Sequence, residues 1–133
     1  MTELQALVFV DAKIIGRHDP TLPKNSFVAY FSENTGVHGF SSVEADQTDE
    51  AELKAIAFAI KELRGKLQEF AIMSDNESVV SQIKRALVKP SSRPVLLEIL
   101  AEMKANHDIT VEFFGKNPAH SFLNQQIARL QGH

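Results

Sequence analysis

The chain has 133 residues, of which 44% are hydrophobic and 23% are charged. These proportions are typical of one globular domain and exclude disordered, collagen-like and membrane-spanning chains. The sequence contains no cysteine, which excludes disulfide bonds, iron–sulfur clusters, zinc sites with cysteine ligands and thiol nucleophiles. Because it shows neither a signal peptide nor an apolar run long enough for a membrane span, we expect a single cytoplasmic domain over residues 1–133 that has no contact with membranes.

The formal net charge is −3 at pH 7. Phosphate groups favour positively charged surfaces, so this charge lowers the expectation of nucleic-acid binding. It does not exclude a local basic patch.

The first third of the chain predicts three strands. The apolar run at residues 6–10 is unbroken and stops at Asp11, which is typical of a strand buried on both faces. Turn-forming residues at 18–25 predict a loop. Two further strands, at 26–32 and 37–43, complete an antiparallel meander.

Helical periodicity begins at Thr48, which we expect to cap a helix whose apolar stripe runs to Leu63 before Gly65. The later elements are a strand at 70–73, helices at 77–87 and 95–106, a strand at 109–114 and a helix at 121–130. The order βββαβααβα predicts an α/β fold with a five-stranded mixed sheet flanked by helices. In such sheets, sites form outside the carboxyl ends of the parallel strands.

Three carboxylates are expected at that edge of the sheet. Asp11 and Asp75 follow two buried strands, and Glu52 lies at the border of the first helix's apolar stripe. Taken singly, each fits a turn cap or a favourable position in the helix dipole. Together they would repel one another, by on the order of 4 kcal/mol per pair at about 4 Å. Such a cluster binds protons or cations, and its oxygen atoms suit Mg²⁺ or Mn²⁺.

The sequence around these carboxylates resembles ribonuclease H of the type 1 kind. The resemblance rests on Asp11, on Thr48–Ala55 and on Ser74–Val80, in an order of elements that matches this fold along nearly the whole chain. It implies a hydrolase, an endonuclease that uses Mg²⁺ or Mn²⁺ to cleave the RNA strand of RNA–DNA hybrids. It also implies that Asp11 is shared by two metal ions and that Glu52 and Asp75 are further ligands of the second.

The chain departs from the family's pattern in three places, of which the third concerns His120. Ala12 stands where the family usually has glycine, and Ala128 stands in the place of the fourth carboxylate within Asn124–Leu130. No Asp or Glu follows Glu112 anywhere in the chain. The missing ligand belongs to the metal that activates the attacking water, and Asn124 offers only a neutral oxygen. Activity is therefore expected to be slow or to need Mn²⁺.

His120, in the predicted loop before the last helix, resembles a family histidine that assists proton transfer or product release, but it lies only four residues before Asn124, closer than is usual in the family. The simpler interpretation is a surface histidine without a role. Basic side chains are candidates for phosphate contacts, although they also fit a solvated helix end. The candidate nucleic-acid-binding residues are Lys84, Arg85, Lys89, Arg93, Lys116 and Asn124. Because the cations are few, we expect weak binding that depends strongly on salt.

Two functions are compatible with these patterns. The first is a ribonuclease H-type nuclease acting on an RNA–DNA hybrid or other nucleic acid. The alternative is a catalytically inactive ribonuclease H-like module that binds nucleic acid or a protein partner. Three retained carboxylates favour the first function, and the absent fourth favours the second. The sequence does not predict an oligomeric state.

Overall fold

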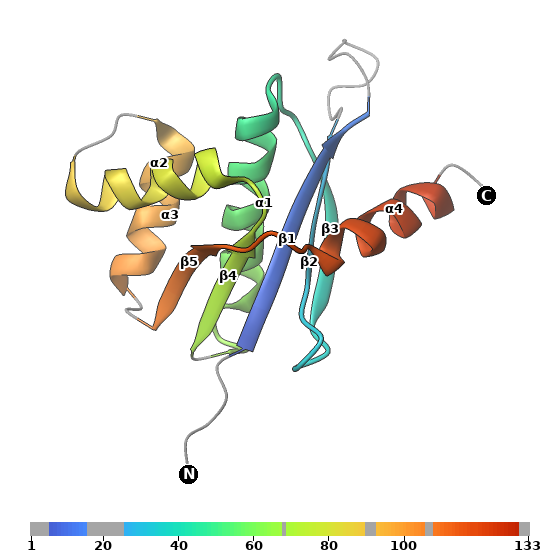
Figure 1. The fold of residues 1–133 in the computed structure, drawn as a ribbon, viewed down its shortest axis with the longest axis horizontal. Helices are drawn as coiled ribbons and strands as arrows, with labels where there is room; N and C mark the ends of the chain where they lie inside the picture. Colours follow the sequence, from blue (N-terminus) through green and yellow to red (C-terminus); the bar gives the residue numbers. More distant parts are fainter. Residues whose placement is uncertain (1–5, 16–25, 68, 90–92, 106–107, 131–133) are drawn as a thin grey trace.

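The computed structural model describes residues 6–15, 26–67, 69–89, 93–105 and 108–130. The loop predicted at 18–25 lies outside the described residues. The strands are β1 (Ala6–Ile14), β2 (Ser26–Phe31), β3 (His38–Val43), β4 (Phe70–Ser74) and β5 (Ile109–Phe113). The helices are α1 (Thr48–Leu63), α2 (Glu77–Val88), α3 (Pro94–Ala105) and α4 (Pro118–Leu130). The predicted order βββαβααβα is confirmed (Figure 1).

The strands form one mixed sheet in the order β3-β2-β1-β4-β5. β1, β2 and β3 pair in antiparallel fashion, as the predicted meander requires. β1, β4 and β5 are parallel, so their carboxyl ends meet at one edge of the sheet. This edge is the one at which the sequence predicts a site.

Helices cover both faces of the sheet. Val28 and Tyr30 of β2 belong to the main core, which they share with apolar residues of α1, α2 and α3. Ala29 points to the opposite face, as strand geometry requires, and packs with Leu123 and Ile127 of α4. Helices α1 to α3 therefore lie on one face, and α4 lies on the other, against β1 and β2 (Figure 1).

β1 is longer than predicted, and this changes the place of Asp11. The strand continues to Ile14 because β2 keeps pairing with it, from Phe9 opposite Phe31 to Ile14 opposite Ser26. The parallel pairing with β4 stops earlier, at Phe9 opposite Met73. Asp11 therefore lies within a strand and not after its end. At this point β1 is paired with β2 on one side, while on the side of β4 it has no strand partner among the described residues.

Two helix starts differ from the prediction. The N-cap of α1 is Gln47 and not Thr48, and its side chain makes no capping hydrogen bond. α4 begins at Pro118 because the Oδ1 atom of Asn117 accepts a hydrogen bond from the backbone N–H of Ala119 (3.0 Å). His120 therefore lies in the first turn of a helix and not in a loop.

The remaining strand and helix boundaries agree with the predicted ones to within one residue. α1 ends as expected: Arg64 is its C-cap, and the next residue, Gly65, has a φ of 88°, which favours glycine. None of the described helices has the length and apolar character that crossing a membrane requires.

Candidate metal centre

The three predicted carboxylates lie together at the carboxyl edge of the parallel strands. Asp11 of β1, Glu52 of α1 and Asp75, directly after β4, each present an oxygen, and these oxygens all lie within 4.8 Å of one another. Asp11 and Asp75 are each two residues beyond the last parallel pair of their strands, Phe9 with Met73. The register of the sheet therefore places them side by side, and the first turns of α1 bring Glu52 to both.

Burial makes Glu52 the most perturbed member of this cluster. Glu52 is 4% exposed and Asp11 is 6% exposed, whereas Asp75 is open to solvent. Desolvation, together with the negative charges of Asp11 and Asp75, raises the pKa of Glu52 from 4.5 to about 9. Without a cation, the buried carboxyl therefore holds a proton at neutral pH.

The hydrogen bonds of Glu52 are incomplete. Its carboxyl group shares a hydrogen bond with the Asp11 side chain and accepts one from the backbone N–H of Ala12. Its Oε2 atom is buried and has no hydrogen-bond partner among the described residues. An unsatisfied buried oxygen of this kind costs about 1–3 kcal/mol. The three carboxylates fit a divalent cation with oxygen ligands, which would give Oε2 a partner.

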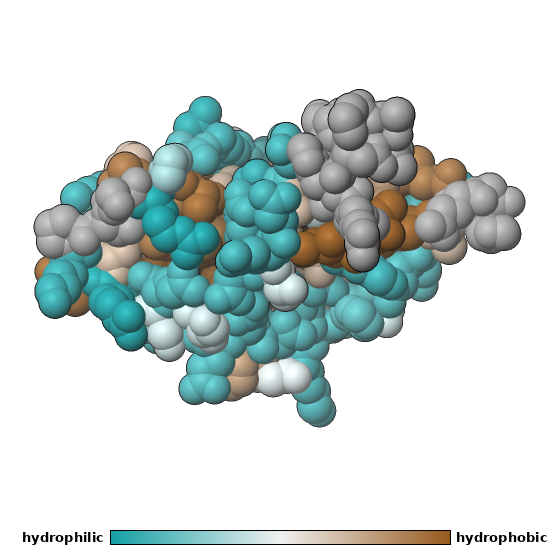
Figure 2. Space-filling model, turned by 90° about the horizontal axis from the view of Figure 1, so that it is seen from above, coloured by the Kyte–Doolittle hydropathy of each residue, from teal (hydrophilic) through white to brown (hydrophobic). Residues whose placement is uncertain are grey.

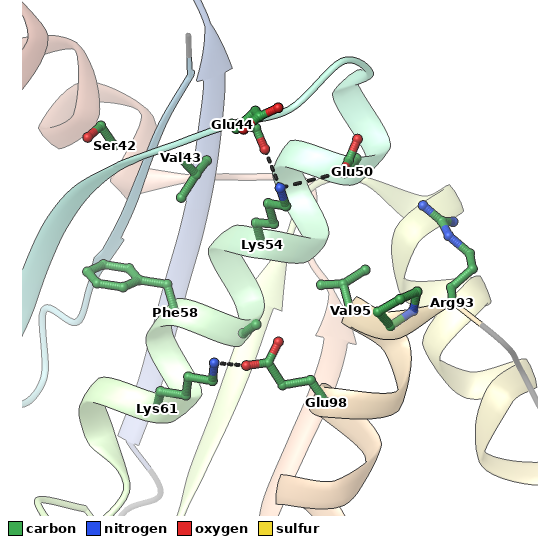
Figure 3. A pocket seen from close by; sticks show the side chains of 12 residues that line it. Ser42, Val43, Glu44, Glu50, Lys54, Phe58, Lys61, Arg93, Val95 and Glu98 are labelled. Carbon is green, nitrogen blue, oxygen red and sulfur yellow. Dashed lines mark hydrogen bonds and ion pairs between the residues drawn. The ribbon is translucent and has the colours of Figure 1, made fainter. Parts of the chain in front are cut away.

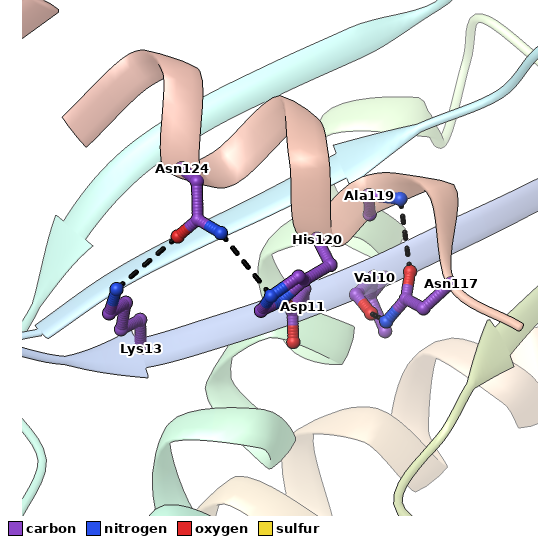
Figure 4. Close-up of polar contacts among 7 residues, drawn as sticks. All are labelled: Val10, Asp11, Lys13, Asn117, Ala119, His120 and Asn124. Carbon is purple, nitrogen blue, oxygen red and sulfur yellow. Dashed lines mark hydrogen bonds and ion pairs between the residues drawn. The ribbon is translucent and has the colours of Figure 1, made fainter. Parts of the chain in front are cut away.

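α4 brings a histidine to the carboxylate of Asp11 (Figure 4). The Nδ1 atom of His120 lies 2.9 Å from Oδ2 of Asp11, and its Nε2 atom lies 3.2 Å from Nδ2 of Asn124. The Oδ1 atom of Asn124 in turn accepts a hydrogen bond from Nζ of Lys13 (3.3 Å). A continuous polar chain thus runs from the buried Asp11 to the exposed Lys13.

The α4 residue beside Asp11 is His120 and not Ala128. Ala128, which the resemblance puts in the place of the fourth carboxylate, lies eight residues further along α4, or about 12 Å along the helix axis. The Oδ1 atom of Asn124 faces Lys13, so it does not offer this oxygen to the carboxylates. The position next to Asp11 on α4 is filled by an imidazole.

Asn117 fixes the start of α4 against β1. Its Nδ2 atom donates a hydrogen bond to the backbone carbonyl of Val10 (2.8 Å), next to Asp11, while its Oδ1 atom caps the helix (Figure 4). No sequence pattern predicted a role for this residue. The Asn-Pro pair could have indicated the helix start, but the contact with Val10 spans 107 residues.

A second polar network holds α1 against α2 and the residue that caps it. Asp49, in the first turn of α1, accepts hydrogen bonds from Asn76 (3.1 Å), Ser78 (3.1 Å) and Gln82 (3.0 Å). Asn76 also caps α2 by accepting a hydrogen bond from the backbone N–H of Val79 (3.1 Å). These contacts fix the spacing between α1, which carries Glu52, and the residue that follows Asp75.

The predicted basic residues are exposed, and some of them are paired. Lys84 forms an ion pair with Glu112 (3.0 Å), and Arg93 donates a hydrogen bond to Gln82 (2.6 Å). The predicted basic residues, all of them exposed, are Lys84, Arg85, Lys89, Arg93 and Lys116. Figure 2 looks onto the end of the molecule toward which β1 runs and shows hydrophilic side chains between two separate apolar areas.

A groove of about 680 Å³ lies elsewhere, between β3, α1 and α3 (Figure 3). None of the three clustered carboxylates lines it. Its lysines are paired: Lys54 contacts Glu50 (3.5 Å) and the backbone carbonyl of Glu44, and Lys61 contacts Glu98. Within the part of the chain that the structure describes, the candidate metal-ligand cluster therefore lies at the sheet edge and not in this groove.

No family model and no curated protein matches the chain. Solved structures match its fold. Ribonuclease H1 from the halophilic archaeon Halobacterium salinarum NRC-1 has a TM-score of 0.63 and 14% identity, over 84% of this chain and 86% of that chain. The foamy viral protease-reverse transcriptase in complex with dsDNA has a TM-score of 0.68 and 15% identity, over 92% and 89%. LC11 ribonuclease H1 in complex with an RNA/DNA hybrid has a TM-score of 0.60 and 14% identity, over 84% and 86%. The chain has the ribonuclease H-like fold that its motifs predict.

Proposed function

We propose that this ribonuclease H-like chain is a nucleic-acid-processing hydrolase, which cleaves the RNA strand of RNA–DNA hybrids with the help of Mg²⁺ or Mn²⁺. The observation that carries the proposal is the buried Oε2 atom of Glu52, which lies in a cluster of three carboxylates and has no hydrogen-bond partner in the described ranges of the chain. Two structures of the same fold hold nucleic acid, one an RNA/DNA hybrid and one dsDNA, which supports this substrate class.

Asp11, Glu52 and Asp75 are the residues that would hold the metal. A bound divalent ion supplies positive charge to the phosphodiester and lowers the pKa of water. Asp11 and Glu52 form the buried floor of the centre, while Asp75 and His120 border it on the solvent side. The phosphodiester therefore approaches from the side of Asp75 and His120. Before Glu52 acts as a ligand, its carboxyl group gives up the proton that burial retains.

Exposed cations are proposed to hold the nucleic-acid backbone. Arg85 and Lys89 lie at the carboxyl end of α2, and Lys116 lies in the segment before α4. Lys84 joins them once a phosphate replaces Glu112 as its partner. Few phosphate contacts give weak binding that salt lowers steeply.

One observation favours the alternative, an inactive module that binds nucleic acid or a protein partner. After Glu112 the chain has no carboxylate side chain, so α4 offers none to a second metal. On this alternative the fold is kept for binding, and the carboxylate cluster contributes no chemistry.

Hydrolysis of an end-labelled RNA–DNA hybrid, in Mg²⁺ and separately in Mn²⁺, tests the proposal. Asp11→Asn and Glu52→Gln keep the shape of each side chain and should abolish cleavage. Glu62→Gln is the matched control: it makes the same change on α1, ten residues from Glu52, and should leave cleavage unchanged. Single-stranded RNA and double-stranded DNA of the same sequence should remain intact.

Two outcomes overturn the proposal. Folded protein that binds the hybrid without cleaving it in either metal supports the inactive module. Cleavage that survives Asp11→Asn places the activity outside the carboxylate cluster.

A further inference from the structure

The imidazole beside Asp11 gives the centre a ligand of a different kind. We propose that Asp11 and His120 form a second cation site, which selects first-row transition ions such as Mn²⁺, Co²⁺ or Zn²⁺ over Mg²⁺. This inference rests on the proposed function, because it assigns a further ion to the same centre.

The distance between the two side chains fits ligands of one ion. Nδ1 of His120 and Oδ2 of Asp11 are 2.9 Å apart. Neighbouring ligands of an octahedral ion, with bonds of about 2.1 Å, are separated by about 3.0 Å. The separation of the two atoms can therefore stay the same when an ion replaces the shared hydrogen, but each side chain has to turn by about 45° so that its lone pair points at the ion and not at the other atom.

Asn124 completes this site by holding the other ring nitrogen. A histidine that ligates through Nδ1 carries its ring proton on Nε2 and needs an acceptor there. The Nδ2 atom of Asn124 lies 3.2 Å from Nε2 of His120. If the amide group of Asn124 rotates by half a turn, its Oδ1 atom takes the place of Nδ2 and accepts this proton. Lys13, which now donates to that oxygen, is released in the ion-bound state.

The second site is distinct from the three-carboxylate site. The compact set of ligand atoms among the described residues consists of Asp11, Glu52 and Asp75, and His120 is outside it. Asp11 contacts Glu52 as well as His120, so its carboxylate belongs to both sites. Two ions that share a carboxylate are the arrangement by which two-metal centres act on phosphodiesters.

Ligand chemistry sets the selectivity. Mg²⁺ prefers carboxylate, carbonyl and water oxygens and gives up its bound waters reluctantly, whereas imidazole suits first-row transition ions such as Zn²⁺; among these ions Mn²⁺ binds a given site least tightly. Because no Asp or Glu follows Glu112, α4 has no carboxylate with which to favour Mg²⁺ at this position. We expect Mg²⁺ to occupy the three-carboxylate site alone and Mn²⁺ to occupy both.

Counting bound ions tests this inference without any substrate. Mn²⁺ is titrated into the full chain, free of any histidine tag, and unbound Mn²⁺ is measured by electron paramagnetic resonance. We expect two Mn²⁺ per wild-type chain and one in His120→Ala, whose second site weakens by about tenfold or more. Pulsed measurements should detect a directly bound nitrogen in the wild type but not in His120→Ala. His38→Ala removes an exposed histidine of β3 and should retain both ions and the nitrogen signal.

His120→Asp provides the converse test. An all-oxygen second site should bind Mg²⁺, so calorimetry should count two Mg²⁺ in the variant and one in the wild type. His120 is exposed, and thermal unfolding without metal should show that both of its variants remain folded. If Mn²⁺ stoichiometry and the nitrogen signal are the same in wild type and His120→Ala, the second site does not exist.

The experiment separates this inference from the proposed function. One bound Mn²⁺ that Glu52→Gln removes and His120→Ala leaves in place overturns the second site while the three-carboxylate centre stands. A wild-type chain that binds neither Mn²⁺ nor Mg²⁺ overturns both.

Discussion

The carboxyl group of Glu52 shares a hydrogen bond with that of Asp11 at a position where both residues are almost fully buried. Two carboxylates cannot both be charged there without a cation, so one of them retains a proton. The raised pKa belongs to Glu52 because it is buried between Asp11 and Asp75. Folding, proton binding and metal binding are therefore linked at this residue.

The first prediction concerns stability without metal. The pKa of Glu52 is raised from 4.5 to about 9 on folding, so between these values the folded chain holds a proton that the unfolded chain has lost. Stability from this group is therefore fully present below about pH 4.5 and falls as pH rises, by up to about 1.4 kcal/mol per pH unit. Urea unfolding in chelator at several pH values should show this fall. Glu52→Gln should remove it and Glu62→Gln should not; equal slopes in all three proteins would contradict the assignment.

The second prediction concerns protons released by metal. Because the ion displaces the Glu52 proton, Mg²⁺ affinity should rise by up to about tenfold per pH unit between about pH 5 and pH 9. Calorimetry in two buffers of different ionisation enthalpy should count close to one proton released per ion at neutral pH. Asp75→Asn should weaken binding but still release the proton. Release of no proton would mean that Glu52 is not a ligand.

The third prediction concerns the network around Asp49. Asp49→Ala removes three hydrogen bonds that α1 makes with α2 and its N-cap, and it should lower the free energy of unfolding by about 1–3 kcal/mol. It should also weaken metal binding by about tenfold, because Glu52 and Asp75 are no longer held at a fixed spacing. Asp49→Asn, which keeps one acceptor, should lose less of both. Unfolding and metal titration of the two variants measure this, and unchanged metal affinity in Asp49→Ala would show that the network only stabilises the fold.

The fourth prediction concerns Asn117. Asn117→Ala removes the α4 cap and the contact with Val10, and it should destabilise the chain by about 1–2 kcal/mol. His120 then loses its fixed position beside Asp11, so the bound-nitrogen signal of Mn²⁺ should weaken. Asn117→Asp keeps the capping oxygen but cannot donate to Val10, which separates the two roles. A signal at full strength in Asn117→Ala would mean that other contacts position α4.

Sequence patterns were sufficient to predict that the three carboxylates lie close together, because their positions follow from local strand and helix patterns. Buried strands run into Asp11 and Asp75, parallel strands share an edge, and a helical stripe turns Glu52 toward the sheet. The position of His120 could not be predicted from such patterns, because it depends on where α4 begins. That start is set by Asn117 bonding to Val10, across 107 residues. The extension of β1 beyond Asp11 likewise comes from pairing with β2 and not from its own apolar run.

The fifth prediction concerns nucleic-acid affinity. Lys84 is paired with Glu112, so Glu112→Gln should free one cation and raise hybrid affinity a few-fold at low salt, with a slightly steeper loss of affinity as salt increases. Glu62→Gln changes the net charge by the same amount near the far end of α1, and it should have a smaller effect. Fluorescence anisotropy with a labelled hybrid in chelator measures binding without cleavage. Equal gains in the two variants would indicate that net charge alone governs binding, and that Lys84 lies outside the surface that contacts the hybrid.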